Sequence, residues 1–278
     1  MSSVRNDTDD CTQTIAVYAV SVWDDSMFEC DDVTSLLEGS DDDPRINDRY
    51  IRCLPAGQCR RSVLLVGVVH DHPSSVFRVS YLLERLSPET LALELPPLAV
   101  QLFRRYADDD HVPPRLGGEM SMAIQAVGAI PTVGIDAPNR SYLKILLVKL
   151  LASDPSIGII ERLLKDTIAG WKQAIACRGA SALATVTPLR PRVYEHLVYG
   201  CTVLDSPTVQ AEHEAAHVLQ RQAFLDAIEV PRSIALIDAA REQYMALRLD
   251  ELRAEGDVVA IVGIEHLDGV TALLHDLS

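Results

Sequence analysis

The sequence predicts an α/β fold in which a mostly parallel β-sheet, built from βα units, is interrupted by a long helical insertion. Short aliphatic runs at residues 63–67, 91–95, 131–135 and 257–262 have the length and composition of strands buried in parallel sheets. Amphipathic segments with helical spacing separate the first three runs, which is the order of βαβ units. The fourth run comes about 120 residues after the third, and the stretch between them is almost wholly helical in pattern.

Each framework helix has its own signal in the sequence. Residues 73–86 open with Pro-Ser-Ser, and their apolar side chains then recur at helical spacing. Residues 98–106 follow the second strand, residues 119–128 precede the third, and residues 269–277 follow the last. The alternation of strand and helix therefore extends over the whole framework.

The insertion occupies about residues 140–253 and is broken near Pro155, residues 187–191, Pro207 and Pro231. Proline ends or kinks a helix, so these positions divide the stretch into successive helices. The sequence leaves two roles open for the insertion. It is either a cap over the site of the framework or a module that joins two copies as a homodimer.

Residues 1–60 form an acidic extension ahead of the domain at 61–278, and its strand candidate is 14–23. The six cysteines of the chain show no CxxC and no paired ligand spacing, so we expect reduced thiols without a function. The opening residues MSSVRNDTDDC are polar and acidic, unlike a secretory signal. No apolar run reaches the roughly 18 residues that would suggest a transmembrane segment. We therefore expect a soluble, cytoplasmic protein.

The chain carries a net charge of −15, and only four of its 25 basic residues are lysines. An acidic surface that is poor in lysine stays hydrated in concentrated salt, and the salt screens the self-repulsion of the charge. This balance predicts a halophilic source. It also argues against nucleic acid as a partner, since phosphate binding requires a basic patch.

Two segments share one local design, an aliphatic strand followed by Gly-x-x-His. They are Gly67 to His70 and Gly263 to His266. A glycine at the end of a strand allows a sharp turn or a close approach of the backbone. A histidine in the loop beyond it lies where open α/β sheets place their ligand sites, so neighbouring strands would bring both imidazoles to one crevice. His72, two residues after His70, is a secondary candidate.

The order of these and other motifs resembles the TraB/PrgY/GumN family, which includes the TIKI proteins and is distantly related to the ChaN and EreA proteins. The resemblance runs across residues 63–275 and is weakest over about 140–230. The similar segments are GVVH (67–70), LALELPP (91–97), GGEMSMAIQAV (117–127), GIDAP (134–138), LIDAAREQYMA (236–246) and VAIVGIEHLDGV (259–270). The resemblance implies an EreA/ChaN-like architecture and a TIKI-like metal-dependent hydrolase, a peptidase acting on peptide or small-molecule substrates.

The resemblance carries five site residues over to this chain. His70 and His266 correspond to metal ligands, and Glu94, Glu119 and Arg241 correspond to catalytic residues. The implied cofactor is a divalent metal ion.

The chain departs from the family pattern at two places. The family usually has Glu-Arg-Asp where this chain has Ala-Arg-Glu at 240–242, and it often has arginine at the position of Ala137. The missing glutamate favours, as an alternative, a non-catalytic regulatory protein of the same family that binds a metal or a peptide without turnover.

The chemistry of the five residues is consistent with the implied function. Two imidazoles with one or two carboxylates suit Zn²⁺, Mn²⁺ or Co²⁺, and such a metal lowers the pKa of bound water from about 15.7 toward about 7. Glu94 or Glu119 would be a ligand or a general base, and Arg241 would stabilise an oxyanion. Each also has a structural interpretation: an acid at a strand end, an acid at a helix N-terminus, and an arginine that pairs with one of them.

A second motif competes with the Gly-x-x-His pair. Residues 213–217 read His-Glu-Ala-Ala-His, and on a helix His213 and His217 lie on one face, as in a zincin site with Glu214 as the base. A third ligand would have to come from Glu229 or Glu242. The alternative interpretation is a surface helix that carries this short motif by chance.

Overall fold

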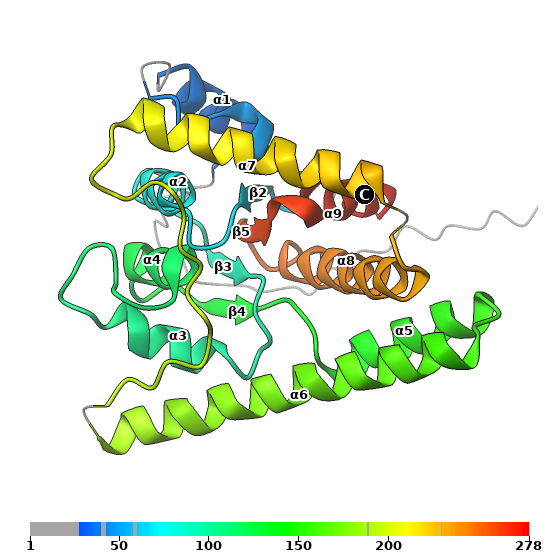
Figure 1. Ribbon diagram of the computed structural model, residues 1–278. Coiled ribbons are helices and arrows are strands. Elements are labelled where there is room, and N and C mark those ends of the chain that lie inside the picture. Colours follow the sequence, from blue (N-terminus) through cyan, green and yellow to red (C-terminus); the bar gives the residue numbers. More distant parts are fainter. Residues whose placement is uncertain (1–27, 40–42, 58–59, 188, 229, 278) are drawn as a thin grey trace, which may run out of the picture.

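The computed structural model describes residues 28–277 except 40–42, 58–59, 188 and 229 (Figure 1). These residues form a five-stranded sheet in the order β1-β2-β5-β3-β4. The strands are β1 (Ile51–Leu54), β2 (Val63–Val68), β3 (Thr90–Leu93), β4 (Thr132–Gly134) and β5 (Val258–Gly263). β1 runs antiparallel to β2, and the other pairings are parallel. The predicted α/β class with a mostly parallel sheet is thus confirmed, while the EreA/ChaN-like architecture stays a prediction.

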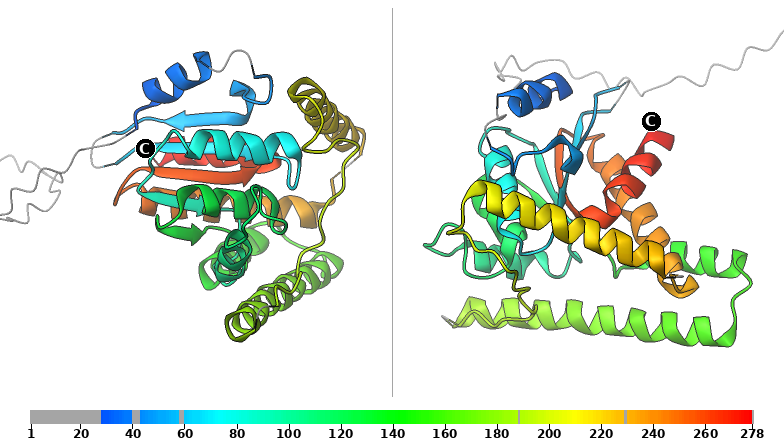
Figure 2. Two further views of the ribbon diagram at one scale, coloured as in Figure 1. Left: turned by 90° about the vertical axis from the view of Figure 1, so that its left-hand side faces the viewer. Right: turned by 45° about the horizontal axis from the view of Figure 1, so that its top comes forward.

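Helices cover both faces of the sheet (Figure 2). One face packs against α2 (Pro73–Leu83), α3 (Val100–Ala107) and α4 (Gly118–Val127), and the other packs against α8 (Arg232–Leu252) and α9 (Ile264–Asp276). Successive side chains of a strand point to opposite faces, so each strand contributes to both cores. In β2, for example, Leu64 and Val66 belong to the first core, whereas Val63 and Leu65 belong to the second.

β2 and β5 are neighbours, although the insertion separates them in the sequence. Gly67 pairs with Val262, and Val68 pairs with Gly263, so the two strands end at the same edge of the sheet. The prediction that both imidazoles meet in one crevice required these two strands to be neighbours, and the structure places them side by side.

The predicted insertion contains α5 (Arg140–Ala152), α6 (Ile157–Val186), α7 (Pro207–Ala227) and α8. α6 turns back along α5, and α7 crosses in front of the sheet (Figure 1). α8 belongs to the framework, since its Met245 and Leu249 are buried in the core beneath the sheet. The segment 187–206 joins α6 to α7, and its described residues form neither helix nor strand; we name it the strap. Within the described residues, no helix is both long and apolar enough to cross a membrane.

The described part of the N-terminal extension adds α1 (Cys30–Glu38), a short 3-10 helix at Asp48–Tyr50 and the edge strand β1. Cys30 and Cys53 form a disulfide, so the expectation of reduced thiols is wrong for this pair. Their spacing carries no pairing signal, and it is the packing of α1 beside β1 that brings their Cα atoms to 5.6 Å. Cys177 and Cys201 are free and buried. The strand candidate at 14–23 lies outside the described residues.

Candidate functional site

Glu119, in the first turn of α4, holds the loop that follows β2. Its Oε1 lies 2.7 Å from Nδ1 of His70, and its Oε2 accepts the backbone N–H of Asp71 at 2.8 Å. The side chain of Glu119 is buried, whereas that of His70 is 40% exposed. Nε2 of His70 has no partner among the described residues. The loop therefore presents one open nitrogen of an imidazole whose other nitrogen is fixed by a carboxylate.

Unusual backbone conformations support this contact. Asp71 has φ 60°, and Gly117 and Gly118 have φ 84° and 50°. Aspartate is one of the few residues with a side chain that tolerate this region, and such strain concentrates at functional sites. A Cβ at Gly118 would lie 2.2 Å from Oδ1 of Asp71, so glycine at this position allows α4 to approach the loop.

Opposing effects act on the pKa of His70. Burial by itself lowers it, but the hydrogen bond and charge of Glu119, together with the charges of Glu94 and Glu265, raise it to about 10. His70 is therefore an imidazolium at neutral pH and a strong base once it has lost its proton.

The second Gly-x-x-His motif differs from the expectation, because His266 lies in a helix and not in a loop. Gly263 ends β5 and caps α9, so His266 falls in the first turn of α9 and is 2% exposed. Its Nδ1 lies 3.1 Å from Oε1 of Glu242, and its Nε2 lies 3.0 Å from Nη1 of Arg241. Burial lowers its pKa, but the hydrogen bond to Glu242 and the charge of Glu94 give a net rise.

Arg241, on α8, connects the second motif to two acidic residues. It donates two hydrogen bonds to Asp136, at 2.9 and 2.8 Å, and one to Glu94 at 2.6 Å. Burial lowers the pKa of Arg241, but the two carboxylates raise it by more, so the guanidinium stays charged. Glu94 follows β3 directly and also accepts the backbone N–H of Gly263. The guanidinium has five N–H groups, and the contacts with Asp136, Glu94 and His266 leave one on Nη1 without a partner in the described chain.

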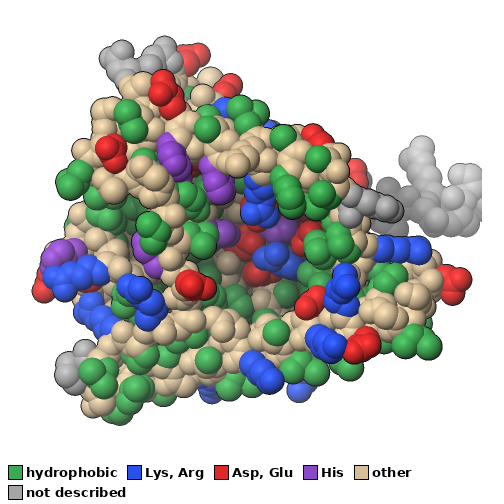
Figure 3. All heavy atoms as spheres, viewed as in Figure 1, with side chains coloured by type: hydrophobic (Ala, Val, Ile, Leu, Met, Phe, Trp, Pro, Cys, Tyr) green, Lys and Arg blue, Asp and Glu red, His purple; other side chains and the backbone are tan. Residues whose placement is uncertain are grey.

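A cavity of about 330 Å³ brings most of the predicted site together. Its lining includes four of the five residues carried over by the resemblance: His70, Glu94, Glu119 and Arg241. Buried His266 is not part of the lining. In the space-filling view the middle of this face is hollowed, and acidic, basic and histidine side chains lie inside the hollow (Figure 3).

The strap closes part of this cavity. It belongs to the insertion, for which a cap over the site is one of the two roles that the sequence leaves open, but no residue of the strap is singled out by the sequence. The N–H of Leu197 donates to Asp71 at 3.0 Å, and the hydroxyl of Tyr199 donates to the carbonyl of His70 at 2.6 Å. Tyr194 and Leu197 belong to the cavity lining. The strap residues carry no periodicity or motif; their one sequence signal is the cluster of prolines that separates them from the helices.

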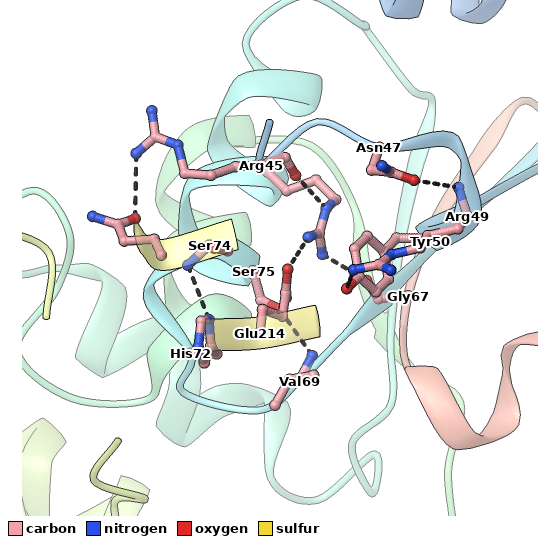
Figure 4. Close-up of polar contacts among 12 residues, drawn as sticks. Arg45, Asn47, Arg49, Tyr50, Gly67, Val69, His72, Ser74, Ser75 and Glu214 are labelled. Carbon is pink, nitrogen blue, oxygen red and sulfur yellow. Dashed lines mark hydrogen bonds and ion pairs between the residues drawn. The ribbon is translucent and has the colours of Figure 1, made fainter. Parts of the chain in front are cut away.

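The His-Glu-Ala-Ala-His motif does lie on a helix, α7, but its glutamate is engaged elsewhere. Glu214 is buried and forms an ion pair with buried Arg78, and its Oε1 accepts the hydroxyl of Ser75 at 2.5 Å (Figure 4). Arg78 also donates to the carbonyl oxygens of Gly67 and Arg45. A zincin base has to face the metal and its water, whereas this carboxylate holds α7 against α2.

Three metal-compatible side chains converge beside the first motif. Among the described residues, the group of three or more side chains that could hold a metal ion consists of His72, Cys201 and His213. Their ligand atoms all lie within 4.8 Å of one another. Nε2 of His72 is 3.2 Å from Nδ1 of His213 and 3.4 Å from Sγ of Cys201. Burial lowers the pKa of His72 to about 4 and raises the pKa of the Cys201 thiol.

The arrangement does not fit one metal ion shared by His70 and His266. Both ring nitrogens of His266 have partners, and the one that would face an ion contacts the guanidinium of Arg241. A divalent cation there would meet a fixed positive charge in a poorly solvated site. These contacts argue against the metal ion that the resemblance implies between the two histidines, and no step of the chemistry below depends on it.

Comparison with known proteins adds no relative. No protein-family model matches the chain, and no curated protein and no solved structure matches it. The resemblance to the TraB/PrgY/GumN family therefore remains a prediction from the motifs.

Proposed function

We propose that this chain is a hydrolase that cleaves a carbonyl compound, a peptide or a small ester or amide, in the cavity beside His70. The observation that carries the proposal is the pairing of His70 with Glu119, with the open Nε2 of the imidazole beside the cavity. A histidine fixed by a buried carboxylate is the usual arrangement for proton transfer in acyl hydrolysis.

Each residue has a task in this reaction. Neutral His70 removes a proton from water as the water attacks the carbonyl carbon, and Glu119 stabilises the imidazolium that forms. The remaining N–H of Arg241 stabilises the negative charge that develops on the carbonyl oxygen. Asp136 and Glu94 act as positioning residues, because they fix the guanidinium; Asp136 does so from outside the cavity lining and Glu94 from within it. The imidazolium then returns its proton to the leaving group.

The lining indicates what the substrate presents to the protein. Apolar side chains make up much of it, including Phe103, Leu116, Met120 and Tyr194. Arg115 and Arg192 add positive charge, and Asp71 and Glu195 add negative charge. A substrate with an apolar group and a polar end fits this combination.

The pH dependence of turnover tests the proposal. With a pKa of about 10, only about one His70 in a thousand is neutral at pH 7, so kcat/KM should rise about tenfold per pH unit until pH approaches 10. In Glu119→Gln the inflection should move to lower pH, because the charge that raises the pKa of His70 is gone. The plateau should also fall, because the imidazolium is less stabilised.

A panel of chromogenic esters and short peptides serves as the assay. His70→Ala should abolish turnover, whereas His275→Ala, which removes an exposed histidine near the end of α9 and outside the cavity lining, should not. Turnover that survives the loss of His70, or that falls as pH rises toward 10, would sink the proposal. Saturable binding of these compounds by a folded wild type that turns none of them over would favour the regulatory alternative.

A further inference from the structure

We propose that His72, Cys201 and His213 form a Zn²⁺ site that anchors the strap to α2 and α7. The three side chains come from the N-cap of α2, from the strap and from α7, so segments that are far apart in the sequence meet at one point. The site is distinct from the cavity of the proposed hydrolase, although His72 lies only two residues beyond His70.

The distances agree with a tetrahedral ion. Zn–N bonds of about 2.0–2.1 Å and a Zn–S bond of about 2.3 Å place two nitrogen ligands about 3.3 Å apart and nitrogen and sulfur about 3.6 Å apart. Two of the three separations here are close to these values: 3.2 Å between the imidazoles and 3.4 Å between Nε2 of His72 and Sγ of Cys201. The third, between His213 and Cys201, lies within 4.8 Å, so a bound ion would draw these two ligands together. Two nitrogens and one sulfur are donors that Zn²⁺ prefers over Mg²⁺ or Ca²⁺.

A buried polar atom without a partner points in the same direction. Nδ1 of His72 now accepts the backbone N–H of Ser74 at 3.2 Å, which places the imidazole hydrogen on Nε2 (Figure 4). Zinc bound at Nε2 requires the hydrogen on Nδ1, and a zinc-bound histidine normally donates that N–H to an acceptor. Oγ of Ser74 is buried and has no hydrogen-bond partner among the described residues. In the metal-bound tautomer the Nδ1–H would face the backbone N–H of Ser74, so the imidazole has to turn away from that donor when the metal binds. The unpaired hydroxyl oxygen of Ser74 is the acceptor that we assign to the Nδ1–H.

The group provides three protein ligands and leaves the fourth position of a tetrahedron to water or a small ligand. When the ion binds, the Cys201 thiol gives its proton to solvent, so the affinity rises with pH. Two neighbouring contacts of the strap, Leu197 to Asp71 and Tyr199 to His70, come two to four residues before Cys201 and attach the strap to residues of the cavity lining. A metal here would fix the strap where it covers the proposed active site.

Metal stoichiometry and cobalt spectra test the site in the full chain. Wild type, stripped with a chelator and dialysed against Zn²⁺, should retain one zinc per chain by mass spectrometry and unfold at a higher temperature than the stripped protein. Co²⁺ should give a thiolate charge-transfer band. Cys201→Ser should lose the band, His213→Ala should lose the zinc, and Ser74→Ala should bind it about 10- to 100-fold more weakly.

Matched variants separate this site from the other histidines. His217→Ala removes the next histidine on the same face of α7, and His70→Ala removes the proposed catalytic base; both should keep the zinc. Circular dichroism of each stripped variant checks that it folds before metal is added. A folded wild type that retains no zinc, or zinc that survives both Cys201→Ser and His213→Ala, overturns the proposal. Loss of zinc in His70→Ala would also overturn it, without bearing on whether His70 is catalytic.

Discussion

Glu214 shows how a residue that looks catalytic in the sequence can be structural in the fold. Its ion pair with Arg78 is almost completely buried, and the two residues join α7 to α2. Removing one partner of such a pair leaves an uncompensated charge in the interior, which costs far more than the pair itself contributes.

We expect Glu214→Ala to lower the free energy of unfolding by about 3–5 kcal/mol. Urea denaturation measures the change, and Glu212→Ala, which removes an exposed glutamate from the same helix, is the control and should stay within about 0.5 kcal/mol of wild type. Replacing both partners by apolar residues of similar size, Arg78→Met with Glu214→Leu, should recover much of the loss. Similar midpoints for Glu214→Ala and Glu212→Ala would show that the ion pair does not form.

At the scale of single residues, the sequence predicts the residues of the candidate site better than it predicts their hydrogen-bond partners. His70, Glu94, Glu119 and Arg241 were all named, and they line one cavity. Asp136 stands out only as part of the GIDAP segment, and Glu242 only as a departure from the family pattern and as a possible third zincin ligand, although one holds Arg241 and the other contacts His266. A carboxylate's partner depends on tertiary packing, and nothing in the local spacing of these residues encodes it.

The helices and strands also divide into those that the sequence predicts and those that it does not. Strands β2 to β5 and helices α2 to α4 were predicted because their aliphatic runs and helical periodicity are local signals. β1 and the strap were not, since a short half-buried edge strand and an extended connection leave almost no pattern. His266 was placed in a loop because α9 was expected to begin at Gly269, whereas Gly263 already caps it.

The disulfide between α1 and β1 makes a contribution to stability that can be measured. Cys30 and Cys53 are separated by 23 residues, and closing a loop of that length stabilises the folded state by about 3 kcal/mol. Adding reductant to the wild type should lower the urea midpoint accordingly. The double variant Cys30→Ser/Cys53→Ser should start at the lower value and should lose the part of the response to reductant that this bond contributes. If thiol titration of the unreduced, unfolded wild type finds both cysteines free, the expectation fails.

For the whole molecule, the excess of acidic residues predicts a strong response to salt. At pH 7 the net charge of −15 repels itself, and raising KCl from 0.1 to 2 M shortens the Debye length from about 10 Å to less than 3 Å. We expect the midpoint of thermal unfolding to rise by about 4–8 °C, equivalent to about 2 kcal/mol. The control is the same titration near the isoelectric point of about 4.9, where little net charge remains to be screened. An equal rise at both pH values would show that self-repulsion is not the cause.

The strap gives the folded chain a built-in site for limited proteolysis. It has no hydrogen-bond ladder of its own, so side chains and backbone groups of the surrounding helices and loops keep it in place. Contacts with Asp71, His70 and His72 hold its second half, and Tyr106 and Gln173 hold the carbonyl oxygens of Pro191 and Val193 in its first half. Arg192 is exposed on it, and a protease needs an extended, accessible segment of this kind. Cleavage by trypsin after Arg192 should therefore slow when a ligand occupies the cavity or a metal binds the Cys201 group. The rate of nicking would reveal an occupant before its identity is known.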